Sequence, residues 1–314
     1  MDLTDSRKFV GTSFGITISA SDLSADASPT TEDYINRLTF QEASHVLREG
    51  GRLVLGHRWK LGGIMHHLAS KARDLRLWRG PAANVSQEPA SITNVIAWPD
   101  TPPTDQDGTA RRLLDQGILE IQSVGVEGID LNGVDPDSDL GVFCRTRALT
   151  GMRKKITELA DVRICLGGGS NKPKRRLSGV LEEAILTIQA EKPLYISSAI
   201  GGISRVICEA ILRRRLSESD RSHFATPAPA RAAMQMYRSE YPFPPEEGPC
   251  TIDDGATDGW NALEYLRSVD LKRLAEIAHL NIDEYINLLT TADLNRAMTM
   301  VALGVKSLRD GVRR

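Results

Sequence analysis

The sequence feature that most constrains the fold is the almost continuous apolar run VRICLGGG at residues 162–169. Such runs are typical of central strands in parallel sheets, whose two faces are both covered. A second run of this kind, PLYISSAIGG, follows at residues 193–202, and a pattern with one apolar helical face lies between the two. Parallel strands joined by a helix form a βαβ unit, so this part of the chain predicts a parallel α/β sheet.

The same alternation of strands and helices extends in both directions from these runs. Further strands are predicted at residues 14–21, 52–57 and 92–98, and helices at residues 31–49, from Gly62 onward, from Ser178 onward and at residues 203–215. The fold class that follows is α/β: a Rossmann-like, doubly wound and mainly parallel sheet with helices on both faces.

The middle of the chain has a weaker pattern. Residues 100–145 are rich in Asp, Gly and Pro, and we expect a short helix, a weak strand and a long loop there. Thr150 is expected to cap a helix that ends at Leu159, directly before the strand VRICLGGG.

The 314 residues allow one large domain, or one domain plus an appendage. We expect a nucleotide-binding Rossmann-like domain over residues 1–216, then a polar, proline-bearing loop or flap over residues 217–258. Residues 259–314 predict a helical extension that packs on the domain or on a partner subunit.

Composition excludes several classes of protein. With 41% apolar and 25% charged residues the chain is globular rather than disordered, and a net charge of −2 gives no general attraction to nucleic acid or to anionic membranes. No apolar run is long enough to span a bilayer, and the amino terminus has no signal-peptide pattern. The four cysteines form no CxxC pair, and we expect reduced thiols in a cytoplasmic protein: Cys144, Cys165, Cys208 and Cys250.

The segment LGGGSNKPKRRLSGVLEEA, from Leu166 to Ala184, combines a strand, a glycine-rich basic loop and the start of a helix. Glycines let backbone N–H groups approach a phosphate, and a helix amino terminus adds free donors and a partial positive charge. Basic side chains would close over the anion. The phosphate-binding residues predicted in this segment are Gly167, Gly168, Gly169, Lys174, Arg175, Arg176, Ser178 and Gly179. The alternative is a solvated basic loop whose glycines serve only the turn.

In open parallel sheets, ligands bind at the carboxyl ends of the strands, near the point where the strand order reverses. Small or basic residues follow the other predicted strands or precede the glycine-rich strand, and they are further candidates for ligand binding: Ser19, Ser21, Gly56, Gly62, Gly63, Arg153, Gly201 and Gly202. Tight packing is the alternative for the pair Gly201–Gly202, and a solvated charge is the alternative for Arg153.

Glu182 and Glu183 are the candidate catalytic residues. A carboxylate one turn into a phosphate-facing helix would bind a ribose hydroxyl, or would stabilise the oxocarbenium-like state of N-glycosidic cleavage with help from Asp22. The alternative is a favourable interaction with the helix dipole. No metal and no cofactor are expected, because His66 and His67 lack a metal-ligand spacing. The chain also lacks the GxGxxG fingerprint after a strand, GxxxxGK[ST] and GxSxG, which disfavours dehydrogenases, P-loop NTPases and α/β-hydrolases.

The segments ALTGMRKKITELADVRICLGGG, SGVLEEA and KPLYISSAIGGISRVICEAI resemble the SLOG superfamily of Rossmann-like domains, over roughly residues 10–215. SGVLEEA is similar to a relaxed form of the LOG motif PGGxGTxxE, with Gly179 and Glu182 at its GxxE positions. Two departures disfavour the LOG hydrolase activity. The basic insertion NKPKRRL separates the two glycine parts, and Val180 stands where the motif has threonine.

The resemblance implies a cytoplasmic receptor for a nucleotide-derived ligand: ADP-ribose, a cyclic ADP-ribose isomer, or another signal made from NAD or nucleotides. It implies a role in antiphage defence with a separately encoded effector, and we expect a homo-oligomer without membrane or nucleic-acid partners. Two alternatives stay open. One is a nucleoside 5′-monophosphate N-glycosidase of the LOG type, and the other is an oligomerising protein whose helical tail assembles subunits.

Overall fold

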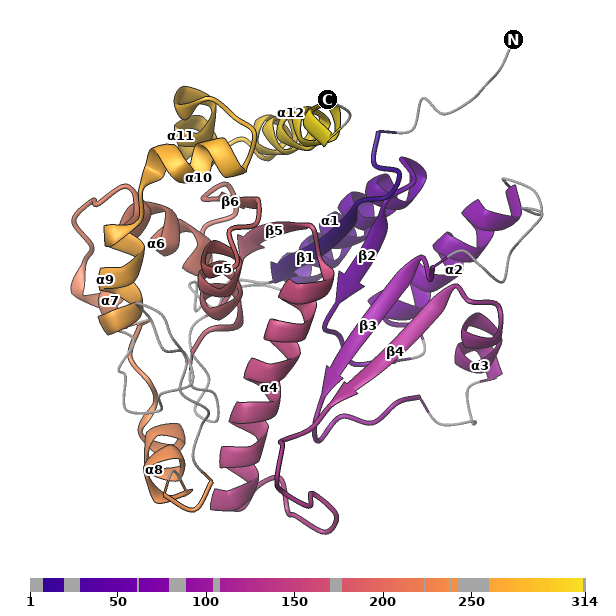
Figure 1. The fold of residues 1–314 in the computed structure, drawn as a ribbon, viewed down its shortest axis with the longest axis vertical. Helices are drawn as coiled ribbons and strands as arrows, with labels where there is room; N and C mark the ends of the chain where they lie inside the picture. Colours follow the sequence, from indigo (N-terminus) through magenta and orange to yellow (C-terminus); the bar gives the residue numbers. More distant parts are fainter. Residues whose placement is uncertain are drawn as a thin grey trace.

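The computed structural model describes residues 8–19, 29–60, 62–78, 89–103, 108–169, 177–222, 224–237, 239–241 and 260–312. Six parallel strands form one sheet in the order β4-β3-β2-β1-β5-β6 (Figure 1). The strands are β1 (Ser13–Ser19), β2 (Arg52–Leu55), β3 (Ile92–Ala97), β4 (Leu119–Val124), β5 (Val162–Gly167) and β6 (Leu194–Ser197). The predicted α/β fold class is therefore confirmed.

Helices cover both faces of the sheet. The helices of the amino-terminal part are α1 (Pro29–Arg48), α2 (Ile64–Trp78), α3 (Gly108–Asp115), α4 (Asp139–Leu159), α5 (Gly179–Gln189) and α6 (Gly202–Ile211). Figure 1 shows α4 on one face, with α1 and α2 on the other. The alternation along β2 agrees, because Leu53 and Leu55 pack in the core cluster that includes α1 and α2, whereas Val54 packs in a second cluster with Phe143 of α4.

The strand order reverses between β1 and β5. From β1 the chain builds β2, β3 and β4 on one side, and α4 then returns it to the other side of β1, where β5 and β6 lie. The register of β1 and β5 pairs Ser19 with Gly167, so both strands end at the same level. In open α/β sheets, ligands bind beyond the carboxyl ends of the strands at such a reversal, and we call this place, at the ends of β1 and β5, the crevice.

The expectation that Thr150 caps a helix was wrong. Helix α4 begins at Asp139, and its N-cap, Ser138, lies twelve residues before Thr150 and accepts a hydrogen bond from the backbone N–H of Gly141 (3.0 Å). Thr150 is buried in the middle of this helix. The long loop expected up to residue 145 is therefore shorter.

Residues 217–258 were expected to form a polar loop or flap, and their described part contains two helices: α7 (Glu218–Ser222) and α8 (Ala228–Tyr237). Pro229 lies in the first turn of α8, where the missing N–H costs nothing. Ala230, Ala233 and Met234 have helical spacing and are buried, and α8 packs on α4. Residues 242–259 lie outside the described residues.

The carboxyl-terminal helices cover β6, which is an edge strand. They are α9 (Trp260–Ser268), α10 (Leu271–Ile277), α11 (Ile282–Thr290) and α12 (Leu294–Val312). The hydroxyl of Tyr285 in α11 donates to the carbonyl oxygen of Leu194 (3.0 Å), and the hydroxyl of Tyr195 in β6 donates to the carbonyl oxygen of Ala278 (2.8 Å). These bonds occupy polar groups that an uncovered sheet edge would expose. Within the described part of the chain, no helix is long and apolar enough to cross a bilayer.

Candidate functional site

Two glycine turns meet at the crevice. Gly167 is the last residue of β5 and Gly168 follows it, with φ of 69° and 94°; Gly201 is the N-cap of α6 and Gly202 its first residue, with φ of 76° and 67°. These positive φ values favour glycine over any residue with a Cβ. The turns are in direct contact, since the backbone N–H of Ile203 donates to the carbonyl oxygen of Gly168 (3.0 Å). The structure thus brings together two turns that lie far apart in the sequence.

Two serine hydroxyls tie these turns to the helices. Ser178, the residue before α5, donates from Oγ to the carbonyl oxygen of Gly169 (3.0 Å). Ser204 in the first turn of α6 donates from Oγ to the carbonyl oxygen of Gly167 (2.8 Å). Helices α5 and α6 therefore both begin at the glycine turns. The first N–H groups of a helix have no partner within it, which makes this edge suited to an anion.

A buried network of charges lies beside the glycine turns. It consists of two arginines, Arg153 of α4 and Arg163 of β5, and two carboxylates, Glu182 and Glu183 of α5, each at most 7% exposed. Because the opposite charges are equal in number, the network is balanced. Burial of such charges is tolerable only when each one is paired.

Each carboxylate of the network has several partners. Glu182 pairs with Arg153 through one carboxylate oxygen, and it accepts a hydrogen bond from the Thr150 hydroxyl on the other. Glu183 accepts a hydrogen bond from the hydroxyl of Thr17 in β1, and its Oε2 lies 3.5 Å from Nη1 of Arg163. The network therefore joins α4, α5, β1 and β5 below the crevice.

Two glycines make room for the arginines. A Cβ at Gly179 would lie 3.2 Å from Nη2 of Arg153, and a Cβ at Gly15 would lie 3.0 Å from Cζ of Arg163. Each guanidinium therefore lies against the backbone of a neighbouring element. The glycine at position 179, predicted as a phosphate-binding residue, thus also provides space for Arg153.

The structure gathers most of the predicted site residues at one place. Around the end of β5 it brings together Gly167, Gly168, Gly169, Ser178, Gly179, Gly201, Gly202, Arg153, Glu182 and Glu183, with Ser19 paired to Gly167 in the sheet. Ser21, Asp22, Lys174, Arg175 and Arg176 lie outside the described residues.

Three predicted residues lie elsewhere. Gly56, at the end of β2, faces Ile156 of α4, since a Cβ there would lie 2.8 Å from Cδ1 of that side chain. Gly62 and Gly63 line a separate cavity of about 710 Å³ between α1 and α2, together with Arg37. That cavity is on the face of the sheet opposite α4. These glycines therefore do not contribute to the crevice wall formed by α5.

Arg163 belongs to the buried charge network, and the buried His57 lies near enough to be influenced by the Glu183 charge, although neither was predicted. The backbone N–H of His57 donates to Oδ1 of Asn94 (3.0 Å), and Nδ2 of Asn94 donates to the carbonyl oxygen of His57 (2.8 Å). Burial lowers the pKa of His57, and the carboxylate of Glu183 opposes this by raising it. The sequence did contain a signal, since Arg163 and Asn94 are polar residues within otherwise apolar strands, and buried polar groups need partners. Among the described residues, no three His, Cys, Asp or Glu side chains are grouped to hold a metal ion.

The parallel sheet, with two glycine turns at the point where strand order reverses, defines a Rossmann-like α/β protein. The family model described as SLOG cluster2 matches residues 11–246, three quarters of the chain, and the protein therefore belongs to this SLOG family. The predicted SLOG relationship is thus confirmed. No curated protein matches the chain.

Proposed function

We propose that this protein binds the phosphate groups of a nucleotide-derived ligand, such as ADP-ribose or a cyclic ADP-ribose isomer, in the crevice between β1 and β5. The observation that carries this proposal is the meeting of two helix starts, α5 and α6, at two glycine turns joined by the bond from Ile203 N–H to Gly168. Donors from two helices directed at one place favour an anion. Membership of a SLOG family supports a nucleotide-related function.

The residues that flank the basic insertion NKPKRRL, which we call the basic segment, lie at the glycine turns. Gly169 and Ser178 are held together by a hydrogen bond of 3.0 Å at the edge of the crevice. Four cations, Lys172, Lys174, Arg175 and Arg176, lie in the short stretch of chain between these two residues. Both flanking residues lie at the crevice, and we expect cations in so short a stretch of chain to reach a bound phosphate. A polyanionic ligand such as a diphosphate fits this concentration of charge.

The burial and the hydrogen bonds of Glu182 favour binding of a ligand over cleavage of its N-glycosidic bond. An N-glycosidase needs a carboxylate with a free lone pair facing the substrate. Glu182 is 1% exposed, and its two oxygens are engaged by Arg153 and Thr150. The LOG-type hydrolase is therefore the second candidate. As a receptor without turnover, the protein would act in antiphage signalling through a separately encoded effector.

The two candidates are separated by incubating the purified protein with nucleoside monophosphates, NAD and ADP-ribose. We expect ADP-ribose to raise the melting temperature, because a ligand that binds only the folded state stabilises it, and we expect chromatography to detect no free base. Release of base that is abolished by Glu182→Gln or Glu183→Gln would favour the hydrolase. Absence of a shift with every nucleotide tested would contradict both candidates.

A charge-reversal pair tests the role of the basic segment. Arg175→Glu with Arg176→Glu should weaken binding of ADP-ribose and leave the melting temperature of the free protein almost unchanged. The matched control is Lys272→Glu with Arg273→Glu, an exposed basic pair on α10 away from the crevice. The control should bind ADP-ribose as the wild type does, and an equal loss of binding in both variants would refute a local role.

A further inference from the structure

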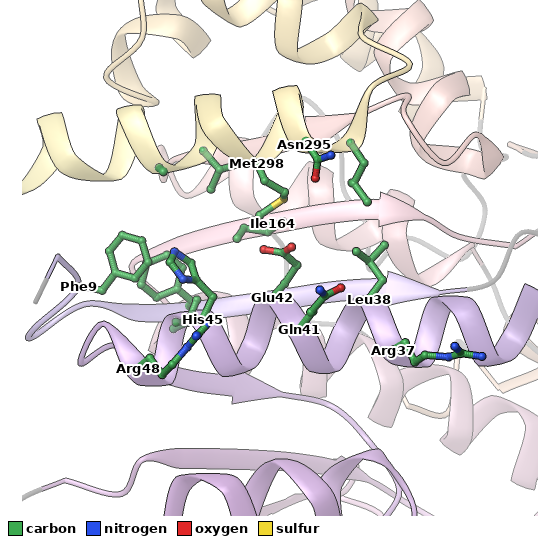
Figure 2. Close-up of a pocket in the computed structure, with 15 residues that line it drawn as sticks. Phe9, Arg37, Leu38, Gln41, Glu42, His45, Arg48, Ile164, Asn295 and Met298 are labelled. Carbon is green, nitrogen blue, oxygen red and sulfur yellow. The ribbon is translucent and has the colours of Figure 1, made fainter. Parts of the chain in front are cut away.

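A second cavity, of about 540 Å³, lies between α1 and α12 (Figure 2). It is on the face of the sheet opposite α4 and shares no residue with the glycine turns. Its floor includes Ile164 of β5 and Phe14 of β1, and Met298 and Val301 line it from α12. A volume of this size is typical of small-molecule sites, whose usual volumes are about 300–1,000 Å³.

The carboxylate of Glu42 lies in this cavity. Figure 2 shows the Glu42 side chain directed from α1 toward Ile164 and the α12 wall. Within the described part of the chain, Glu42 has no hydrogen-bond or ion-pair partner, and burial raises its pKa. Partial burial of a carboxylate without a partner is unfavourable, so a ligand that supplies a hydrogen-bond donor would offset this cost.

We propose that the cavity is a second small-molecule site, which takes an amine carried on an apolar body. The ammonium group would pair with Glu42, and the apolar body would pack between the sheet and α12. This site goes beyond the phosphate-binding function proposed above and does not depend on it.

The other polar residues of the lining are Arg37, Gln41, His45, Arg48 and Asn295. His45 packs edge-on against Phe9 with ring centroids 5.6 Å apart, and burial lowers its pKa, so it is neutral near pH 7. Arg37 and Arg48 are exposed at the two ends of the lining, where water screens their charge, and in Figure 2 the Arg37 guanidinium extends away from the cavity. Glu42 is thus the charged group that faces the interior.

The test uses ligand-observed NMR at about pH 8, where the amines are protonated and the carboxylate is ionised. The probes are tyramine, tryptamine and 4-phenylbutylamine, and the comparison compounds are carboxylates that carry the same rings. Wild-type protein should bind at least one amine more tightly than its matching carboxylate. Glu42→Gln, which keeps the shape and removes the charge, should weaken that binding about tenfold or more.

Two further variants make the result specific to the cavity. Ala302→Trp fills the space from the α12 wall, away from Glu42, and should abolish amine binding. Glu49→Gln, just beyond α1 and outside the cavity lining, should bind amines as the wild type does. Failure of all three amines to bind at millimolar concentration would overturn the proposal. So would binding that is equal in Glu42→Gln and the wild type, or that survives Ala302→Trp.

Stability gives an independent measurement. Because Glu42 is an unpaired, partly buried acid, Glu42→Gln should leave the free energy of unfolding of the ligand-free protein unchanged or raise it. A clear loss of stability would show that Glu42 has a partner inside the protein, and it would overturn the proposal.

Discussion

Gly202 lies directly against the carbonyl of Gly168: a Cβ at position 202 would be 2.4 Å from that oxygen. This contact joins the start of α6 to the turn after β5 and so forms the candidate phosphate site. Gly201 has a similar positive φ, but a Cβ there would meet nothing within 4 Å. Both glycines therefore have a backbone conformation that favours glycine, but of the two it is Gly202 that is in close contact with the turn after β5.

The first prediction uses this matched pair. Gly201→Ala should lower the free energy of unfolding by about 1–3 kcal/mol, because φ of 76° with ψ of −143° is a backbone conformation that residues with a Cβ rarely adopt. Gly202→Ala should lower it by about 1–3 kcal/mol more, because the methyl group forces the two turns apart. Urea unfolding of both variants measures the difference, and equal losses would mean that the contact between the turns is not tight.

The second prediction concerns the buried pair of Arg153 and Glu182. Arg153→Met alone leaves a buried carboxylate without its cation and should cost about 3–5 kcal/mol. The double variant with Glu182→Gln should recover much of this loss, since it removes both charges. A double-mutant cycle from urea unfolding gives the coupling energy. Additive effects of the two substitutions would refute the pairing.

The third prediction follows from the lowered pKa values of His45 and His57, which both result chiefly from burial. Below the unfolded value of about 6.5 the unfolded chain binds more protons than the folded protein, so the free energy of unfolding must fall as pH falls through this window. The double variant His45→Gln, His57→Gln should show a shallower fall between about pH 7.5 and pH 6. An unchanged slope in urea unfolding series would show that these histidines are not shifted.

The fourth prediction concerns the three described cysteines. Cys144, Cys165 and Cys208 are buried, and burial raises the pKa of each thiol. The thiolate is the reactive form, so these thiols should react slowly with a thiol reagent at neutral pH. In a Cys250→Ser variant, native protein should show no rapid reaction, and urea should release three reactive thiols. A rapid reaction of one thiol in the native variant would contradict the burial.

The sequence predicted the fold class because β5 and β6 are apolar on both faces, and the helix between them has a clear apolar side. It also located the glycine-rich loop at the end of a strand. The prediction of where α4 begins was wrong, because the Asp- and Gly-rich stretch before Ser138 concealed an N-cap. The prediction of a loop at α8 was wrong, because proline in a first helical turn was interpreted as part of a loop.

Other features depend on tertiary packing, which no local pattern reveals. The buried pairing of Arg163 with Glu183 requires that β5 and α5 lie side by side and that Gly15 leaves space on β1. The cavity at Glu42 forms only because α12 packs over a helix far away in the sequence. Periodicity identifies elements, whereas the space between elements depends on how they pack.

The most direct test of the central claim is amide hydrogen exchange with and without ADP-ribose. Bound phosphate should accept hydrogen bonds from the backbone at the two glycine turns, so peptides that cover residues 167–169 and 201–204 should gain protection. Peptides from α1 and α12 should be unchanged and serve as the internal control. Protection at both turns is the predicted result. Binding of ADP-ribose that protects other segments and leaves both turns unchanged would contradict the phosphate site proposed here.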